Sequence, residues 1–187
     1  MKFLIAGLGN IGDEYANTRH NIGFVILEAL ASEAKVSFTS QRLASVAEIK
    51  IRGHVLVLIK PTTLMNLSGK AVKYWLDKEK IPIENLLVVT DDLDLELGTL
   101  RMKPRGSGGS HNGMNNIIET FGISEFARLR IGIGSDFARG FQVDYVLGRW
   151  SKNEEKTLIP CINQAVEMVK SFVLQGTDRT MSDFNKK

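Results

Sequence analysis

The sequence predicts an α/β protein, a single-domain three-layer α/β/α sandwich around a mixed, twisted β-sheet. Strand-like and helix-like segments alternate along the 187 residues, which is typical of a sheet with helices on both faces. Leu86 to Thr90 is a continuous apolar run, as expected for a central strand that is covered on both sides. The β-rich segments Ser45–Ile51 and Val55–Ile59 are joined by Arg52-Gly53, which predicts an antiparallel hairpin and makes the sheet mixed.

The remaining elements follow from the spacing of apolar residues. A spacing of three and four residues predicts a helix, and a short apolar run that ends in glycine predicts a buried strand. In chain order we expect a strand over Lys2–Ala6, a helix from about Asn21, a helix over Leu67–Lys80, a strand over Thr99–Lys103, a short helix ending at Phe121 and a strand over Leu129–Ile133.

The C-terminal part begins with a helix start signal. Ser151 and Glu154 have the spacing of a capping box, and Gly176 ends the apolar pattern that follows. Pro160 lies inside this pattern, so we expect a kink or a later helix start there. Residues 177–187 are polar and end in lysines, so we expect a mobile tail.

The composition limits the class of protein. A hydrophobic fraction of 43% and a charged fraction of 24% are those of an ordinary globular chain. No apolar run approaches the roughly 18 residues that a membrane span needs, and the N-terminus does not resemble a signal peptide. Cys161 is the one cysteine, and His20, His54 and His111 show no metal-ligand spacing. We therefore expect a cytoplasmic protein without a metal.

The charges are unevenly distributed along the chain. The 24 basic and 21 acidic residues give a net charge of +3, which permits a polyanionic partner without requiring one. Acids dominate between Leu76 and Leu100. The basic residues that follow are Arg101, Lys103, Arg105, Arg128, Arg130, Arg139, Arg149 and Lys152. A surface that is basic on one side suits nucleic acid, although scattered solvated charges would give the same pattern.

The glycines after the first strand match a dinucleotide-binding motif only in part. Residues 7–12 read GLGNIG, which fits GxGxxG. Such a site needs a helix that starts within the loop, but apolar periodicity begins only near Asn21. No acidic residue ends a second strand at the required distance. A nicotinamide or flavin role is therefore disfavoured.

A histidine and an aspartate form a candidate catalytic pair. His20 lies just past the glycine loop, and Asp91 ends the predicted central strand, where sites form in open α/β sheets. An aspartate bonded to one imidazole nitrogen leaves the other nitrogen as a general base near neutral pH. A lone histidine is more often structural. Asp91, Asp92, Asp94 and Glu96 could instead bind magnesium or calcium, but their alternation with leucines favours a solvated sheet edge.

Two further loops have alternative interpretations. Residues 60–69 follow a strand, and Asn66 there could simply cap the next helix. Residues 105–113 are rich in glycine, flanked by basic residues and followed by a helix, which suits a phosphate cradle. A flexible loop without a ligand would look the same.

Taken together, five segments resemble the bacterial-type peptidyl-tRNA hydrolase family. They are GLGNIGDEYANTRHNIGF (7–24), KPTTLMNLSG (60–69), DDLDLELGTLRMK (91–103), GGSHNGMNNI (108–117) and FARLRIGIG (126–134), in family order and spacing. The resemblance implies hydrolysis of the ester between a peptide, an N-acylated amino acid, and the 3′ end of tRNA, which recycles prematurely released peptidyl-tRNA. It also implies a monomer that needs no cofactor and no obligate protein partner.

The resemblance also assigns roles to single residues. His20 would be the base that activates water, Asp91 its orienting partner, and Asn10 the amide that contacts the scissile carbonyl. Asn66 and Asn112 would hold the peptide or the acceptor end. Further contacts with the substrate or with tRNA phosphates fall to Tyr15, Met65, Gly109, His111, Lys103, Arg130 and Arg139.

Two positions depart from the family pattern, and one alternative function stays open. Ile11 stands where proline is usual, and Ser110 where glycine is usual, which matters because serine tolerates positive φ poorly. The alternative is a non-catalytic RNA-binding protein on the same fold. Such a protein could lose the His20 and Asp91 pair, which this chain keeps.

Overall fold

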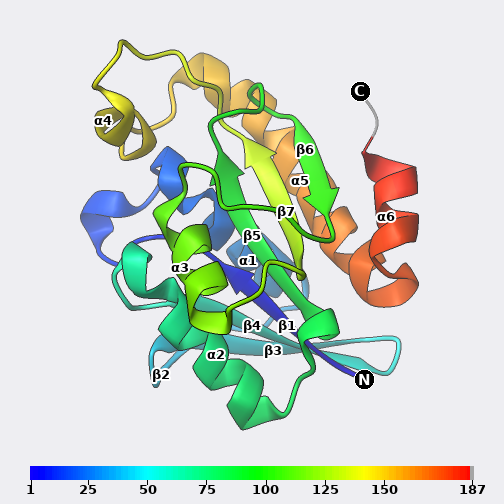
Figure 1. Ribbon diagram of the computed structural model, residues 1–187. Helices are drawn as coiled ribbons and strands as arrows, with labels where there is room; N and C mark the ends of the chain where they lie inside the picture. Colours follow the sequence, from blue (N-terminus) through cyan, green and yellow to red (C-terminus); the bar gives the residue numbers. More distant parts are fainter. Residues whose placement is uncertain (186–187) are drawn as a thin grey trace.

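One seven-stranded sheet, in the order β2-β3-β4-β1-β5-β7-β6, organises residues 1–185, which the computed structural model describes (Figure 1). The strands are β1 (Lys2–Gly7), β2 (Thr39–Gln41), β3 (Ala44–Ile51), β4 (His54–Pro61), β5 (Leu86–Asp92), β6 (Leu100–Lys103) and β7 (Ala127–Gly132). Strands β4, β1, β5 and β7 are parallel neighbours, whereas β2–β3, β3–β4 and β6–β7 pair antiparallel. The prediction of a mixed sheet is confirmed.

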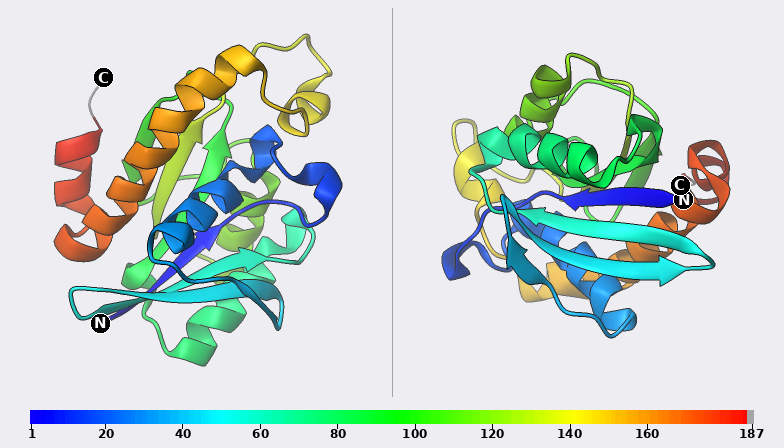
Figure 2. Two further views of the ribbon diagram at one scale, coloured as in Figure 1. Left: turned by 180° about the vertical axis from the view of Figure 1, so that it is seen from behind. Right: turned by 90° about the horizontal axis from the view of Figure 1, so that it is seen from below.

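Helices cover both faces of this sheet. They are α1 (Ile22–Glu33), α2 (Ser68–Glu79), α3 (Asn112–Phe121), α4 (Gln142–Val146), α5 (Lys152–Gln175) and α6 (Thr177–Phe184). Helices α1 and α5 lie together behind the sheet, as the left view of Figure 2 shows, and α2 and α3 pack together on the opposite face. The three-layer α/β/α arrangement is therefore confirmed. Within residues 1–185, no helix is long and apolar enough to cross a membrane.

Strand β5 shows why its sequence is apolar throughout. Leu87 and Val89 belong to the core beneath α1 and α5, and Leu86 and Val88 belong to the core beneath α2 and α3. All four side chains are fully buried because successive residues of a strand point to opposite faces. A strand between two apolar layers must end where its sequence becomes polar, and here that point is Asp91.

The predicted hairpin forms through a two-residue turn. Strands β3 and β4 pair from Ala44↔Pro61 to Ile51↔His54, and the turn residues Arg52 and Gly53 have φ of 47° and 83°. Two consecutive residues with positive φ match the twist of an antiparallel pair, which is why a glycine stands in the turn.

The long C-terminal helix differs in one respect from the prediction. The capping box between Ser151 and Glu154 is present, but the helix does not start later at Pro160. Pro160 is exposed, whereas Leu158, Cys161 and Ala165 are buried on the other side of the helix. Packing of that apolar face offsets the one backbone hydrogen bond that proline removes.

The prediction of a tail from residue 177 is wrong for the residues that the structure describes. Residues 177–184 form α6, which packs against α5 and β6. Thr180 is fully buried, and its hydroxyl lies 2.7 Å from that of Ser171. The Asn185 amide bonds both the N–H and the carbonyl of Met102 in edge strand β6, at 2.9 and 2.8 Å. Residues 186 and 187 of the predicted tail lie outside the described residues.

The acidic segment after β5 is a turn, not the predicted sheet edge. The carboxylate of Asp92 accepts the N–H of Asp94 at 2.8 Å, and the Asp92 carbonyl accepts the N–H of Ile133 at 3.1 Å. The first of these bonds is local and forms the turn, and the second lies at the end of the pairing between β5 and β7. The sequence patterns also missed β2 and α4, both of which contribute no buried residue.

We predict that Asn185→Ala destabilises the fold, because it leaves the Met102 N–H and carbonyl without their partner. Losing two part-buried hydrogen bonds should lower the free energy of unfolding by about 1–3 kcal/mol. Thermal unfolding should then shift by about 2–4 °C for each kcal/mol. Asn153→Ala, at an exposed position of α5, is the matched control. Equal melting temperatures for the two variants would contradict a stabilising role of α6 docking.

Candidate active site

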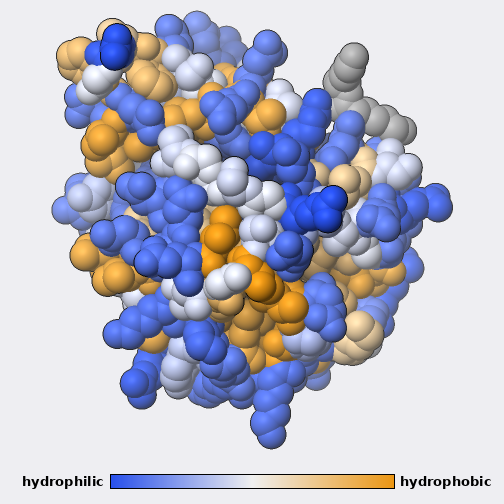
Figure 3. Space-filling model, viewed as in Figure 1, coloured by the Kyte–Doolittle hydropathy of each residue, from blue (hydrophilic) through white to orange (hydrophobic). Residues whose placement is uncertain are grey.

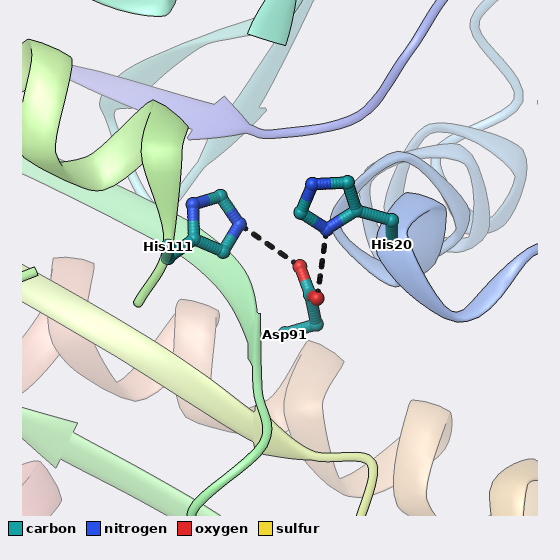
Figure 4. A group of neighbouring side chains, drawn as sticks. All are labelled: His20, Asp91 and His111. Carbon is teal, nitrogen blue, oxygen red and sulfur yellow. Dashed lines mark hydrogen bonds and ion pairs between the residues drawn. The ribbon is translucent and has the colours of Figure 1, made fainter. Parts of the chain in front are cut away.

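The candidate site is organised around the carboxylate of Asp91, at the carboxyl end of β5. Its side chain is 2% exposed and receives a histidine on each oxygen. His20 Nδ1 lies 2.8 Å from Oδ2, and His111 Nε2 lies 3.0 Å from Oδ1 (Figure 4). His20 and Asp91 therefore lie in contact, as the sequence predicts. The second histidine was predicted to line the cleft, but its bond to Asp91 had no signal in the sequence.

The fold explains why these residues meet. Strands β1 and β5 are parallel neighbours, so the loop that follows β1 leaves the sheet beside Asp91. That loop ends in the 3₁₀ turn η2 (Arg19–Asn21), which carries His20. The glycine-rich loop after β6 ends at the start of α3, where His111 is the N-cap residue. Three segments far apart in the sequence thus converge on one carboxylate.

Both ring nitrogens of His111 are engaged. Nδ1 accepts the backbone N–H of Met114 at 3.2 Å, so the ring proton is on Nε2 and is donated to Asp91. The three side chains His20, Asp91 and His111 could by spacing hold a metal, since their ligand atoms lie within 4.8 Å of one another. An imidazole whose Nε2 carries a proton cannot offer that nitrogen to a cation. The geometry therefore fits a hydrogen-bonded triad better than a metal centre.

Charge and burial act in opposite directions in this triad. Burial alone would raise the pKa of Asp91, but electrostatic attraction to the ring N–H groups of His111 and His20, together with their hydrogen bonds, holds that pKa well below its usual range. For His20, burial lowers the pKa, while the Asp91 charge and hydrogen bond outweigh it and raise the pKa above the ordinary 6.5. Asp91 thus stays ionised, and His20 keeps Nε2 as its one ring nitrogen not bonded to Asp91.

A cleft of about 300 Å³ opens over the triad. The glycine-rich loop 106–111 forms one wall, and Gln142, Val143 and Val146 of α4 form another. The predicted site residues that line this cleft are His20, Asp91, Lys103, Gly109, His111, Asn112 and Arg130. Arg130 is bonded to Asp92 at 2.9 Å, whereas Lys103 is exposed. The cleft therefore combines an imidazole, a helix N-terminus and cationic side chains.

Asn10 is brought next to the His20 turn by Asn21. The side-chain amide of Asn21 accepts the Asn10 N–H at 2.8 Å and donates to the Asn10 carbonyl at 2.9 Å. Asn21 is buried and precedes α1, yet it clamps this loop instead of capping the helix. Asn10 itself lines a second hollow of about 360 Å³, beside Lys60 and Glu28, rather than the cleft above the triad. Ile11 is exposed in this loop.

Four other predicted residues do not line the cleft. Asn66 is exposed in the turn η3 (Met65–Leu67), and the N-cap of α2 is Leu67, so helix capping does not explain Asn66. Met65 is buried against the first turn of α3, where a Cβ on Gly113 would approach its sulfur to 2.6 Å. Tyr15 is half-buried in the turn η1 (Asp13–Tyr15), and Arg139 is exposed between β7 and α4.

Arg128 was predicted to belong to a basic surface, and that is wrong. Arg128 is only 1% exposed. Its guanidinium donates to the carbonyls of Gly106 and Ser124 at 2.6 Å and to that of Phe126 at 3.1 Å. Burial, with a contribution from Arg130, lowers the pKa of Arg128 to about 10. A buried cation bonded to main-chain carbonyls anchors the glycine-rich loop.

The serine in the glycine-rich loop avoids the strained backbone region. Gly109 takes the left-handed conformation with φ of 57°, and Ser110 is not among the residues with positive φ. The departure from the family pattern at Ser110 is therefore compatible with the loop, because the neighbouring glycine supplies the turn.

Known proteins match the chain over nearly its whole length. The family model described as "Peptidyl-tRNA hydrolase" matches residues 4–187. Peptidyl-tRNA hydrolases of Phocaeicola vulgatus and Cytophaga hutchinsonii are 52% and 53% identical over 187 residues, covering 100% of both chains. The crystal structure of peptidyl-tRNA hydrolase from Acinetobacter baumannii superposes with a TM-score of 0.92 at 35% identity, covering 98% of this chain and 94% of that one.

We predict that Arg128→Lys destabilises the protein although it keeps the charge. A lysine presents one ammonium group and cannot reach carbonyls in the three directions that the guanidinium spans. The loss of charge-assisted bonds should lower the free energy of unfolding by about 2–4 kcal/mol. Arg105→Lys, at an exposed position of the same loop, is the control. Chemical denaturation would contradict this account if both variants had wild-type stability.

Proposed function

The chain belongs to the peptidyl-tRNA hydrolase family and hydrolyses peptidyl-tRNA, and we propose that His20 is the general base of this reaction. The observation that carries the proposal is the 2.8 Å contact between His20 Nδ1 and the buried Asp91 carboxylate. That contact holds the ring proton on Nδ1 and leaves the lone pair of Nε2 for a water molecule.

The reaction then proceeds by direct attack of water. His20 Nε2 removes a proton as the water oxygen bonds to the ester carbonyl carbon. The C–O bond to the ribose then breaks, and the imidazolium returns the proton to the leaving ribose oxygen. Asp91 stabilises the imidazolium without taking its proton. Because an alkoxide of ribose is a better leaving group than an amide nitrogen, this ester needs no covalent nucleophile.

We assign the amide of Asn10 to the scissile carbonyl, where charge develops. One donor of this kind contributes on the order of 10²–10³-fold to rate when it is held in place, and the Asn21 clamp holds the Asn10 backbone. Asn66 and Asn112 would pair with the peptide main chain or the acceptor end, because amides both donate and accept. Tyr15, Met65, Gly109 and His111 complete the contacts that we propose for the substrate.

Phosphate contacts fall to the basic groups. Lys103 is exposed at the cleft and has no ion-pair partner among residues 1–185, so it can meet a phosphate directly. Arg130 also faces the cleft but must share its charge with Asp92. Arg139 lies farther along the chain that leads to α4. We propose these three residues for the tRNA backbone, with Lys103 as the strongest contact.

The proposal extends to the state of the whole protein. We propose that residues 1–187 form one peptidyl-tRNA hydrolase domain that acts as a monomer, without an obligate protein partner. We place it in the cytoplasm, where ribosomes produce the substrate and recycling of tRNA is needed. The decisive experiment is release of labelled N-acetyl-amino acid from tRNA by the purified protein with chelator present. A non-catalytic RNA-binding protein would bind the substrate without cleaving it.

We predict that His20→Ala lowers kcat at least about 100-fold, the contribution of a positioned base, while tRNA affinity stays near wild type. His54→Ala is the matched control, since His54 is at the start of β4. Retention of more than about a tenth of the activity would place the base elsewhere.

The pH dependence should report the influence of Asp91. His20 acts as a base only when neutral, so kcat/KM should be full at high pH and fall as the pH drops through the His20 pKa. Since Asp91 raises that pKa, the wild-type midpoint should lie above 6.5. Asp91→Asn removes the charge, so its midpoint should shift to lower pH and kcat should fall. A midpoint that is unchanged in Asp91→Asn would contradict the pairing.

Lys103→Ala should raise KM with little change in kcat, because a phosphate contact stabilises ground and transition states alike. The slope of log affinity against log salt should flatten by about 0.7–0.9 for one lost phosphate contact. Lys156→Ala, exposed on α5, serves as the control. If both variants showed the same salt slope as wild type, Lys103 would not lie on the tRNA path.

A further inference from the structure

Arg19, the residue before His20, connects three separate parts of the protein. Its NH1 donates to the Tyr145 carbonyl in α4 at 3.0 Å, and its NH2 donates to Glu154 in the first turn of α5 at 2.8 Å. The guanidinium also lies 4.1 Å from the centre of the Tyr145 ring and 5.7 Å from that of Trp150. Only 12% of its side chain is exposed. These contacts make Arg19 a junction rather than a surface charge.

Helix α4 has few other attachments. None of its residues is buried, and Val143 is 67% exposed. Apolar patches lie in the region of α4 at the upper left of Figure 3. Apart from Arg19, it is held through Tyr145, whose hydroxyl donates to the Ile133 carbonyl at 2.6 Å and whose ring centre lies 5.1 Å from that of Phe137. With so little apolar burial, directed polar contacts must set the place of this helix.

Main-chain contacts bring the same two segments together. The Arg19 N–H donates to the Gly148 carbonyl at 3.0 Å, and Thr18 pairs with Arg149 in an isolated antiparallel bridge. Space there is tight, since a Cβ on Gly148 would lie 2.7 Å from Arg19 NH1. The turn that carries His20 and the segment that carries α4 are therefore joined by polar contacts of the main chain, which we call the polar seam. The side chain of Arg19 adds its own hydrogen bonds to this seam.

Glu154 adds a second constraint to the seam. Its Oε1 accepts both the Arg19 guanidinium and the backbone N–H of Ser151, each at 2.8 Å, so the capping box of α5 orients the acceptor for Arg19. Because the acceptor is fixed in this way, the Arg19 guanidinium is held in one orientation. Helix α5 is anchored in the core by its apolar face, so it provides a rigid reference.

We propose that Arg19 is a positioning residue that ties the α4 wall of the cleft to the His20 turn. The wall residues Gln142, Val143 and Val146 then keep a set distance from His20, which lines the same cleft. This inference rests on the proposed role of His20. Without the tie, α4 moves away from its place and the substrate ester is no longer held against Nε2, although the His20 contact with Asp91 survives.

The test compares Arg19→Met, which keeps length and apolar bulk, with Arg19→Lys, which keeps the charge but cannot span Tyr145 and Glu154 together. Arg179→Met removes an exposed ion pair in α6 and is the matched control. For each full-length variant, kcat/KM on peptidyl-tRNA, its pH midpoint, the melting temperature and amide hydrogen exchange of residues 142–148 are measured.

We expect Arg19→Met to lower kcat/KM at least tenfold and to speed exchange in residues 142–148 at least tenfold, with exchange in β1 and β5 unchanged. The pH midpoint should stay at the wild-type value because Asp91 is untouched, and Arg19→Lys should recover part of both effects. Should Arg19→Met fail to fold, Arg19→Lys decides the matter by the same two measurements.

In Arg19→Met, either unchanged exchange in residues 142–148 or faster exchange with wild-type kcat/KM would overturn the proposal. A loss of the same size in Arg179→Met would overturn it as well. The proposed function fails separately, if His20→Ala remains active, and the exchange measurement still reports whether Arg19 holds α4.

Discussion

The whole site depends on one ionised carboxylate that is buried at the end of a central strand. Burying a charge is unfavourable unless charged or hydrogen-bonding partners surround it. Asp91 meets this requirement with an imidazole on each oxygen, at 2.8 and 3.0 Å. To supply those imidazoles, the chain must bring the loop after β1 and the start of α3 to the same point. The parallel order of β1 and β5 makes that possible.

The two histidines differ because their second nitrogens differ. His111 uses Nδ1 to cap α3, so its ring is bonded on both sides and serves to position Asp91. His20 is bonded to Asp91 through Nδ1 alone, which leaves Nε2 available for the role of base that we propose. The division of roles thus follows from which backbone donor lies beside each ring, and a sequence that contains both histidines does not reveal it.

Periodicity predicted most of the fold because the core elements have strongly patterned sequences. The buried run of β5, the hairpin turn at Arg52-Gly53 and the capping box at Ser151 are local signals, and each has its expected structure. The misses are non-local. Residues 177–184 have the sequence of a polar tail, but they form a helix that packs against the edge strand β6. Helix α4 has no buried residue, so its sequence shows no apolar periodicity.

The same distinction applies to the site. His20 and Asp91 could be paired in advance, because one follows a strand-end loop and the other ends a central strand. Arg128 and Arg130 are two residues apart in the same apolar strand, yet one is buried on main-chain carbonyls and the other is paired with Asp92. The alternation of a strand predicts that both arginine side chains lie on the same face of the sheet, and nothing more. What each arginine meets depends on loops folded from elsewhere.

The segments around His20 share one structural feature, which explains how irregular segments can hold a fixed geometry. Each loop is tied by one buried or half-buried polar side chain that bonds main-chain atoms: Asn21 for the Asn10 loop, Arg128 for the glycine-rich loop and Arg19 for α4. Main-chain atoms are present whatever side chain the loop carries. Ile11 and Ser110 can therefore depart from the family pattern while the loops that carry them keep their anchors.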